Sequence, residues 1–476
     1  MKKVVFILLS IILVIHNSFL CLAASEWPPD VDIKADGGIL MDAETGTVLS
    51  GKNIYEKYYP ASITKILTAI IVLENCSLDE TVSFSHDAIF DVEANSKNAN
   101  LAEGDTLTVE ECLYVLLLHS ANEVANALAE HVSGSKEEFS ILMNQRAKEI
   151  GCVNSNFVNP SGLNDPNHYT CAYDMALIAK EAYKNKKFVE IDSTVNYKMP
   201  PTLNSPNGQD ISIGHKMLKK NWAEYDSRVF AGKTGYTSLA GNTLVTFAKK
   251  DKLNLIAVIL NGHSTHYADT KVLLDFGFEN FTLINMPEEV YDPLKEDLIF
   301  NGIMLDSSGN VQIKTEGNFI VVPKGTDVSD VEKIISNEGL SKDSQKAFAK
   351  VSYSYKKKQV GTAFFYLKVN KEFGQDKPQE LYTKSASDDN KNTELPHVNY
   401  RYVKFMVVLT FISVIVISLY LWSIQRRRRR KELHLERIKI LCKDNQELYN
   451  EYLEKFNVNR KRLKLNFKKR RRFRKK

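Results

Sequence analysis

Short apolar runs separated by polar turn residues occur near both ends of residues 30–283, in a pattern typical of β-strands. The segment "GGILMDAETGTVLSGKN" (37–53) holds two short apolar runs around a Glu-Thr-Gly turn, which predicts a pair of strands. The segment "TLVTFAKKDKLNLIAVILNG" (243–262) predicts a second pair, joined through charged Lys250 and Asp251. The region between the two pairs is therefore enclosed by strands.

Between these strands, apolar residues recur at the three- and four-residue spacing of amphipathic helices. The segment "TVEECLYVLLLHS" opens with Thr108 and Glu111, the spacing of a capping box, and continues as a strongly apolar helix. Strands at both ends with helices between them predict an α/β sandwich with a helical insert. The expected helices are residues 62–74, 108–120, 122–132, 174–184 and 266–281.

The pattern changes after residue 286. The segments "LIFNGIMLD", "NFIVVPKG", "KVSYSY" and "GTAFFYLKV" are short apolar stretches separated by Gly, Asp and Lys, and they predict a small β-rich domain over 287–373. We find no catalytic constellation there. Residues 375–402 are polar and contain proline, which is typical of a flexible linker.

The N-terminus has the pattern of a secretory signal peptide. Lys2 and Lys3 precede an apolar run, and the small residues Ala23 and Ala24 offer a cleavage site, so we expect residues 1–24 to be removed. An uncleaved membrane anchor is the alternative interpretation.

A second apolar run, residues 405–424, contains 20 residues without a charge. At 1.5 Å per residue it is about 30 Å long as a helix, the thickness of a bilayer core. The segment "QRRRRRK" follows at once, and such a block of basic residues favours the cytoplasmic side. We therefore expect a single transmembrane helix, with residues 25–404 outside the cell and 425–476 inside.

Charge is distributed very unevenly along the 476 residues. Residues 426–476 hold 22 basic and 6 acidic residues, a net charge of +16, whereas the remaining 41 basic and 52 acidic residues give residues 1–425 a net charge of −11. Anionic lipid at the inner leaflet is the simplest partner for the basic cytoplasmic tail, at about 1 kcal/mol per basic residue near the surface. Alternatively, the basic tail serves only to fix the orientation of the chain in the membrane. Nothing in the tail indicates recognition of nucleic acid bases.

The cysteines do not indicate a metal site. Cys76, Cys112, Cys152 and Cys171 would be exported, and none of them shows the C-x-x-C spacing typical of zinc ligands. A disulfide outside the cell is one possibility, but the sequence does not pair the four residues, and buried free thiols are the reading we favour. We expect no metal and no cofactor.

The segment "PASITKILTA" (60–69) carries the first candidate for catalysis. Ser62 and Lys65 are three residues apart at the start of an amphipathic helix, so their side chains share a face. A serine nucleophile needs a base, and lysine serves only when neutral, which requires burial or a neighbouring cation. The apolar residues that follow would bury this helix and desolvate Lys65.

Two further segments can complete such a site. In "FAGKTGYTSLAGNTLV", Lys233 lies at the end of a strand-like run and would keep Lys65 neutral, while Gly235 permits close backbone approach. In "LLLHSANEVANAL", Ser120 falls at a break between two helices, where a hydroxyl can relay a proton. Taken singly, Ser120 and Asn122 are common helix caps, and Lys-Thr-Gly is a common surface turn.

Together, Ser-x-x-Lys, Ser-x-Asn and Lys-Thr-Gly occur in the order used by the penicillin-recognising serine acyltransferases. Residues 30–283 resemble the low-molecular-weight penicillin-binding proteins, the D-alanyl-D-alanine carboxypeptidases of serine peptidase family S11. The stretches "YPASITKILTA", "NPSGLNDPNHYTCAYDMALIAK" and "GKTGYTSLAGNTLV" carry this resemblance. It implies the β-lactamase/DD-peptidase-like α/β sandwich with a helical subdomain, and the β-rich region resembles the domain that follows it there.

The resemblance also implies a role for each motif residue. Ser62 attacks the carbonyl between two terminal D-alanines of a peptidoglycan stem peptide, Lys65 takes its proton, and Ser120 passes a proton to the leaving D-alanine. Backbone N–H groups of Ser62 and Tyr236 form the oxyanion hole, water hydrolyses the acyl-enzyme, and β-lactams trap the serine. The substrate-binding residues are Asn122, Lys233, Thr234, Gly235, Tyr236 and Thr237.

Three rival functions follow from the same residues. A β-lactamase of this motif order uses a Glu-x-x-Leu-Asn segment, and we find none between Asn122 and Lys233. A cell-wall-binding scaffold without activity would be expected to lose Ser62 or Lys65. A DD-endopeptidase or transpeptidase shares the chemistry, and the sequence separates it poorly from a carboxypeptidase. The segment "VFAGKTG", where relatives often have "DGIKTG", and the full membrane span also depart from the family pattern.

Overall fold

The computed structural model describes residues 26–286, 311–336 and 347–369. The expected signal peptide, linker, membrane span and basic tail lie outside these residues, as does the segment "LIFNGIMLD". Among the described residues, no helix is both long enough and apolar enough to cross a membrane.

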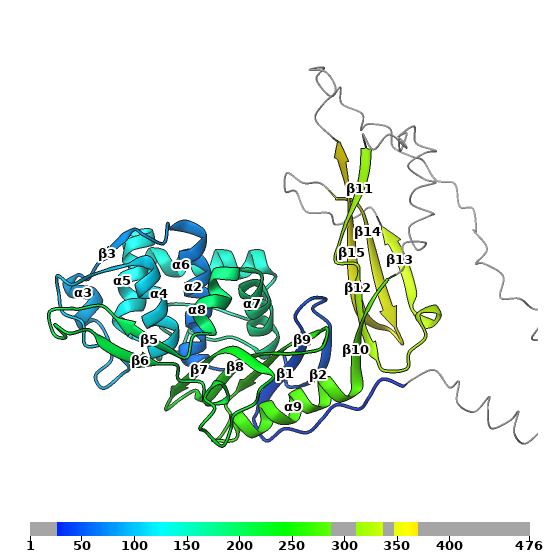
Figure 1. Cartoon of the computed structure of the whole chain (residues 1–476), viewed down its shortest axis with the longest axis horizontal. Coiled ribbons are helices and arrows are strands. Elements are labelled where there is room, and N and C mark those ends of the chain that lie inside the picture. Colours follow the sequence, from blue (N-terminus) through cyan, green and yellow to red (C-terminus); the bar gives the residue numbers. More distant parts are fainter. Residues whose placement is uncertain (1–25, 287–310, 337–346, 370–476) are drawn as a thin grey trace, which may run out of the picture. The chain divides into compact units, whose positions relative to one another are not determined.

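An antiparallel sheet forms the centre of the first region (Figure 1). Its strand order, β2-β1-β9-β8-β7, places the first hairpin of the sequence beside the last one. Every residue of β1 and of β9 is buried, because both strands lie inside the sheet with helices over them. The strands are β1 (Gly37–Asp42), β2 (Val48–Lys52), β7 (Val229–Thr237), β8 (Gly241–Lys250) and β9 (Leu253–Leu260).

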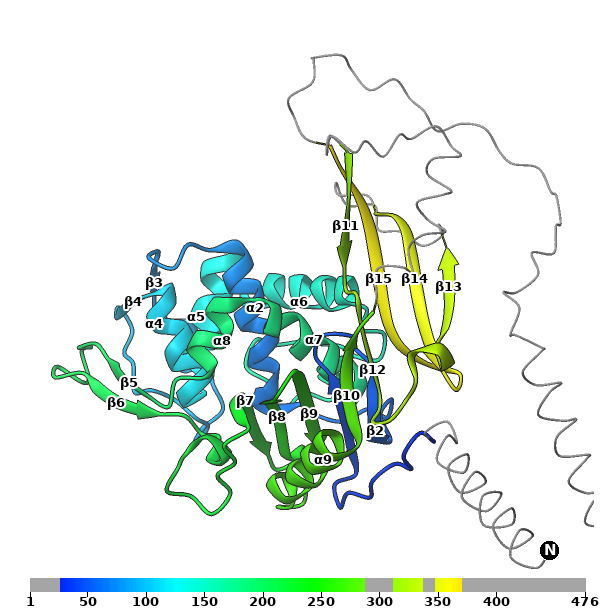
Figure 2. The same ribbon diagram turned by 45° about the vertical axis from the view of Figure 1, so that its right-hand side comes forward.

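Helices cover both faces of this sheet. Helix α9 packs against β8 and β9, while α7 contacts β1 and β9 from the other side, as the two views show (Figures 1 and 2). The predicted α/β sandwich is therefore confirmed. The helices are α2 (Lys65–Asn75), α3 (His86–Phe90), α4 (Val109–Tyr114), α5 (Asn122–Ser133), α6 (Lys136–Ile150), α7 (Ala172–Lys184), α8 (Lys186–Asp192) and α9 (His266–Asn280).

The helical insert begins where the sequence predicts it and departs from the prediction at one point. Both hydrogen bonds of the expected capping box are present: Thr108 accepts from the backbone of Glu111, and the Glu111 carboxylate accepts from the backbone of Thr108. The helix then widens into a π-helical segment, Val115–His119, instead of continuing as α-helix. It ends at Ser120, whose φ of 67° is left-handed. Two small antiparallel strand pairs accompany this insert, β3 (Thr81–Ser83) with β4 (Thr106–Thr108) and β5 (Asn196–Met199) with β6 (Gln209–Ser212).

The second region consists of strands, and three of the four predicted apolar segments fall on them. Strands β12, β14 and β15 carry "NFIVVPKG", "KVSYSY" and "GTAFFYLKV". One sheet has the order β11-β15-β14-β13, and β10 pairs with β12. The strands are β10 (Phe281–Asn285), β11 (Val311–Glu316), β12 (Phe319–Pro323), β13 (Glu332–Ser336), β14 (Ala347–Tyr355) and β15 (Lys358–Val369).

Candidate active site

The Ser-x-x-Lys segment forms a 3₁₀ turn, Ala61–Thr64, that runs directly into α2. Ile63, Ile66 and Leu67 are fully buried and hold this turn against the core. Lys65 is buried with them, whereas Ser62 keeps partial contact with solvent. The Lys65 Nζ lies 3.0 Å from the Ser62 Oγ, so the expected contact between hydroxyl and amine is present.

Lys65 has two further partners, and both are acceptors. Its Nζ donates to the Asn122 Oδ1 at 2.7 Å and to the backbone carbonyl of Ser161 at 2.6 Å. A neutral amine has two N–H bonds and one lone pair. Because Asn122 Oδ1 and the Ser161 carbonyl take the two N–H bonds, the lone pair is directed at the Ser62 hydroxyl. This is the geometry that a general base for Ser62 requires.

The surroundings of Lys65 favour its neutral form. Its pKa lies well below the usual range of a lysine, first because burial removes water from the ammonium and second because of the positive charge on Lys233. Glu123 acts in the opposite direction. The sequence-based expectation that Lys233 helps to keep Lys65 neutral agrees with this balance of charges.

Ser120 and Asn122 lie on either side of the break between the π-helical segment and α5. The left-handed backbone of Ser120 brings its Oγ within 3.0 Å of the Lys233 Nζ, which donates to it. Asn122 begins α5 and turns its Oδ1 to Lys65. The Asn122 amide nitrogen is thus the part of the side chain available to a substrate carbonyl, and Ser120 connects to the second lysine.

Strand β7 supplies the Lys-Thr-Gly segment from the edge of the sheet. Lys233 is buried and also donates to the Thr234 carbonyl at 2.9 Å. A methyl group on Gly235 would lie 2.8 Å from the Ser62 backbone nitrogen and would overlap the Thr243 hydroxyl, so only glycine lets β7 approach Ser62 this closely. Tyr236 comes next and is 68% exposed, which leaves this strand edge open to an extended peptide.

The two threonines of this strand have different environments. A methyl group on Gly214 would lie 3.0 Å from the Thr234 Oγ1, so Thr234 faces the wall formed by that loop. The Thr237 hydroxyl accepts from the Ala240 backbone N–H at 3.0 Å, which closes the turn between β7 and β8. Thr237 therefore already has one partner, and it retains its hydroxyl hydrogen for a second.

A cavity of about 580 Å³ opens over these residues. Ser62, Ser120, Asn122 and the β7 segment from Thr234 line it, and Lys97 and Lys216 lie on its wall. Lys65 and Lys233 lie behind this lining, where water does not reach them. The structure therefore brings all the predicted site residues to one cavity wall, with the two buried lysines beneath it.

Sequence reasoning missed two contributors. The first is the backbone carbonyl of Ser161, which fixes Lys65 from the "NPSGL" loop. The second is Asp192, the last residue of α8, which is fully buried next to β7. Burial raises the pKa of Asp192 to about 7, while the charge of Lys233 and the Gly232 amide oppose this. Burial lowers the pKa of Lys233 to about 8, and Asp192 opposes that shift.

Comparisons with known proteins agree on one family. The model of the D-alanyl-D-alanine carboxypeptidase family matches residues 23–264. A D-alanyl-D-alanine carboxypeptidase of Bacillus subtilis, DacF, is 31% identical over 311 residues, which cover 63% of this chain and 76% of DacF. The D-alanyl-D-alanine carboxypeptidase DacC of Escherichia coli is 30% identical over 317 residues, which cover 62% of this chain and 73% of DacC.

Two solved structures share the fold. Penicillin-binding protein 6B from Escherichia coli aligns with a TM-score of 0.54 at 22% identity, over 73% of this chain and 98% of that one. Penicillin-binding protein 5 from Haemophilus influenzae aligns with a TM-score of 0.54 at 24% identity, over 71% and 97%. These alignments support the DD-peptidase-like α/β fold.

Proposed function

This chain belongs to the D-alanyl-D-alanine carboxypeptidases of serine peptidase family S11, and from that membership we propose that Ser62 is its nucleophile. The substrate is the stem pentapeptide of peptidoglycan, and the reaction removes its terminal D-alanine. The observation that carries the assignment is the contact between the Lys65 Nζ and the Ser62 Oγ, with the acceptors of Asn122 and Ser161 on the same nitrogen. Ser120 also contacts a buried lysine, but the charge of that lysine, Lys233, is one of the causes that lower the pKa of Lys65.

Acylation begins with the transfer of the Ser62 proton to Lys65. The Oγ then attacks the carbonyl carbon of the penultimate D-alanine, and its oxygen becomes negatively charged. The backbone N–H groups of Ser62 and Tyr236 would donate to that oxyanion, and the close approach of β7 to the Ser62 amide at Gly235 supports this role. One such donor typically contributes about 10²–10³ in rate.

Collapse of the tetrahedral intermediate requires a proton on the leaving amine of D-alanine. Ser120 is in contact with the Lys233 ammonium and lines the cavity beside Ser62, so its hydroxyl can donate to the amine and recover a proton from Lys65 or Lys233. Lys233, Thr234 and Thr237 bind the terminal carboxylate, and the Asn122 amide orients the peptide. A water then attacks the acyl-enzyme and releases the shortened stem.

A β-lactam presents a strained amide and a carboxylate to the same groups. We expect it to acylate Ser62 and to leave the enzyme blocked, since its leaving nitrogen stays attached to the acyl group. Penicillin labelling therefore reports on the nucleophile and its base independently of the natural substrate.

The test compares the full chain with its Ser62→Ala variant in D-alanine release from a stem pentapeptide and in labelling by a fluorescent penicillin. We expect both signals from the wild type and neither from the variant. Labelling without D-alanine release would favour a DD-endopeptidase or transpeptidase acting on crosslinked wall. The absence of both signals from the folded wild type would leave a wall-binding scaffold as the better account.

We further propose that the enzyme is held at the outer face of the cell membrane. The signal-peptide pattern of residues 1–24, the charge-free run 405–424 and the arginine block after it support this orientation. The basic residues of 426–476 would then contact anionic lipid of the inner leaflet.

A further inference from the structure

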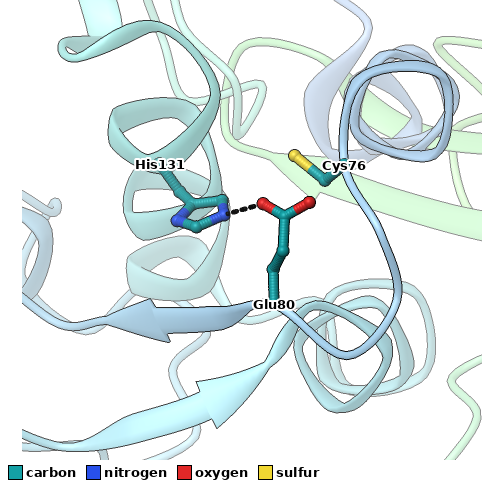
Figure 3. A group of neighbouring side chains, drawn as sticks. All are labelled: Cys76, Glu80 and His131. Carbon is teal, nitrogen blue, oxygen red and sulfur yellow. Dashed lines mark hydrogen bonds and ion pairs between the residues drawn. The ribbon is translucent and has the colours of Figure 1, made fainter.

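A cysteine, a glutamate and a histidine meet at a place remote from the cavity (Figure 3). Cys76 follows the last residue of α2, Glu80 lies in the turn before β3, and His131 lies in the last turn of α5. Their ligand atoms, one from each residue, all lie within 4.8 Å of one another. Sequence spacing did not show this cluster because its members come from three elements and His131 is 51 residues from Glu80.

The cluster is held in place by the backbone around it. One Glu80 oxygen accepts from the Ser77 N–H at 2.5 Å, and the other lies 3.0 Å from the His131 Nε2. The Glu80 carbonyl in turn accepts from the Val109 backbone at 2.9 Å. Helix α5 packs against both α2 and β3. The carboxylate is thus oriented by a second partner, as metal-binding carboxylates usually are.

The electrostatic surroundings favour a cation. Cys76 caps the C-terminus of α2, and His131 lies in the C-terminal turn of α5, which ends at Ser133. Helix C-termini carry partial negative charge. The cluster therefore lies beside two such partial charges, in addition to the charge of the Glu80 carboxylate. The side chains of His131 and Glu80 are 23% and 43% exposed, so an ion can enter from solvent.

We propose that Cys76, Glu80 and His131 bind a zinc ion. Thiolate, imidazole and carboxylate are the ligands zinc takes, with bonds of about 2.0–2.3 Å. Ligand atoms at such bond lengths lie about 3.3–3.8 Å apart around a tetrahedral ion, so small side-chain rotations close the site. Binding releases the Cys76 thiol proton to solvent and places the ion between Glu80 and His131. Water takes the fourth position.

The site would act on structure and not on the peptidase reaction. Cys76 and the Ser62–Lys65 pair lie at opposite ends of α2, whose 11 residues span about 16 Å. An ion bound here joins the C-terminal ends of α2 and α5 to the turn before β3. Its binding should therefore stabilise the fold and leave acylation of Ser62 unchanged.

The test is a cobalt titration of the full chain, purified without a histidine tag, kept reduced and stripped of metal with a chelator. We expect one Co²⁺ per chain with a thiolate-to-cobalt charge-transfer band that Zn²⁺ abolishes, and a melting temperature that rises with Zn²⁺. Cys76→Ser should remove the band. His131→Gln, whose amide still donates to Glu80, should weaken binding by at least about tenfold.

The matched control is His86→Gln. His86 pairs with Glu103 at 3.0 Å, the same distance as in the His131–Glu80 pair, but without a cysteine beside it. This variant should bind cobalt like the wild type. Penicillin labelling of every variant shows that it is folded. A wild type without the band, or a band that persists in Cys76→Ser, would overturn the zinc site and leave an ordinary ion pair.

Discussion

At the scale of single residues, the catalytic proposal depends on Lys65 being neutral. Arginine at this position would stay charged at every accessible pH and has no lone pair for the Ser62 proton. We expect Lys65→Arg to lower the rate of penicillin labelling by roughly 10²–10⁴, the usual contribution of a general base. Lys220→Arg, on the surface, should label at the normal rate. Normal labelling of Lys65→Arg would mean that another group activates Ser62.

The proximity of Asp192 to Lys233 predicts how the KM of the enzyme depends on pH. Burial lowers the pKa of Lys233 to about 8, so its positive charge is present below that pH and is lost as pH rises through it. The KM for a substrate with a free carboxylate should accordingly rise above pH 8. In Asp192→Asn the negative charge that opposes this lowering is gone, so the pKa of Lys233 falls further.

The increase in KM should then move to lower pH, by about one pH unit, while kcat at pH 6 changes little. KM measured from pH 6 to pH 10 checks this, with exposed Asp210→Asn as the control. A profile that stays in place, or that moves to higher pH, would show that Asp192 does not act on Lys233.

How much of the site could be predicted differs from residue to residue, for physical reasons. Ser62 and Lys65 were predictable because helical geometry alone brings residues three apart together. The Ser161 carbonyl was not, because a backbone acceptor carries no residue-type signal. Asp192 was not either, since an aspartate at a helix end usually faces water, and the packing of α8 against β7 and neighbouring helices carries no local sequence signal.

At the scale of elements, the loop that holds Lys65 makes a prediction about glycine. Gly162 and Gly134 share the same φ of +84°, but their surroundings differ. A methyl group on Gly162 would overlap the Ala61 carbonyl and lie 2.8 Å from the Thr64 Oγ1, whereas nothing lies within 4 Å of one on Gly134. Both alanine variants carry the left-handed strain of about 1–2 kcal/mol.

Only Gly162→Ala should also displace the turn that carries Ser62. We expect Gly134→Ala to lower the melting temperature and to label normally with penicillin. Gly162→Ala should be less stable still and should label more slowly, at least about tenfold, because a misplaced nucleophile loses its alignment. Thermal unfolding and labelling rates measured on the same samples decide this. Equal labelling by the two variants would show that the loop does not position Ser62.

Elements whose signal is local were the ones that sequence patterns predicted. The capping box at Thr108 and the hairpin of β8 and β9 depend on near neighbours. The π-helical segment before Ser120 had no such signal, because an apolar run predicts an α-helix whether its backbone hydrogen bonds follow the α or the π pattern. Its effect is nonetheless large, since the left-handed Ser120 that ends it brings the hydroxyl to Lys233.

At the scale of the whole molecule, the sheet order shows where sequence reasoning stops. Each hairpin was visible, but the pairing of β1 with β9 joins residues more than 200 positions apart, such as Gly37 and Leu260. The apolar runs of both strands, which also contain Asp42 and Asn254, indicate burial but carry no signal for which strand lies beside which. That pairing helps to bring the 3₁₀ turn Ala61–Thr64, which follows the first hairpin, against β7, which precedes the last strands.

The proposed catalytic residues and the proposed membrane anchor lie in different parts of the sequence, which predicts the effect of removing the C-terminus. All groups assigned to catalysis lie in 26–286, so a chain ending at residue 404 should release D-alanine from a soluble stem pentapeptide at the normal rate per molecule. Lacking the charge-free run 405–424, it should leave the membrane fraction and enter the medium.

A chain ending at residue 425 keeps that run and should stay with the membrane, because hydrophobic burial of some 20 residues outweighs the lost attraction of the basic tail to lipid. Fractionation followed by penicillin labelling compares the three chains directly. Retention of the shorter chain on membranes would place the anchor elsewhere, with an uncleaved N-terminal segment as the first candidate.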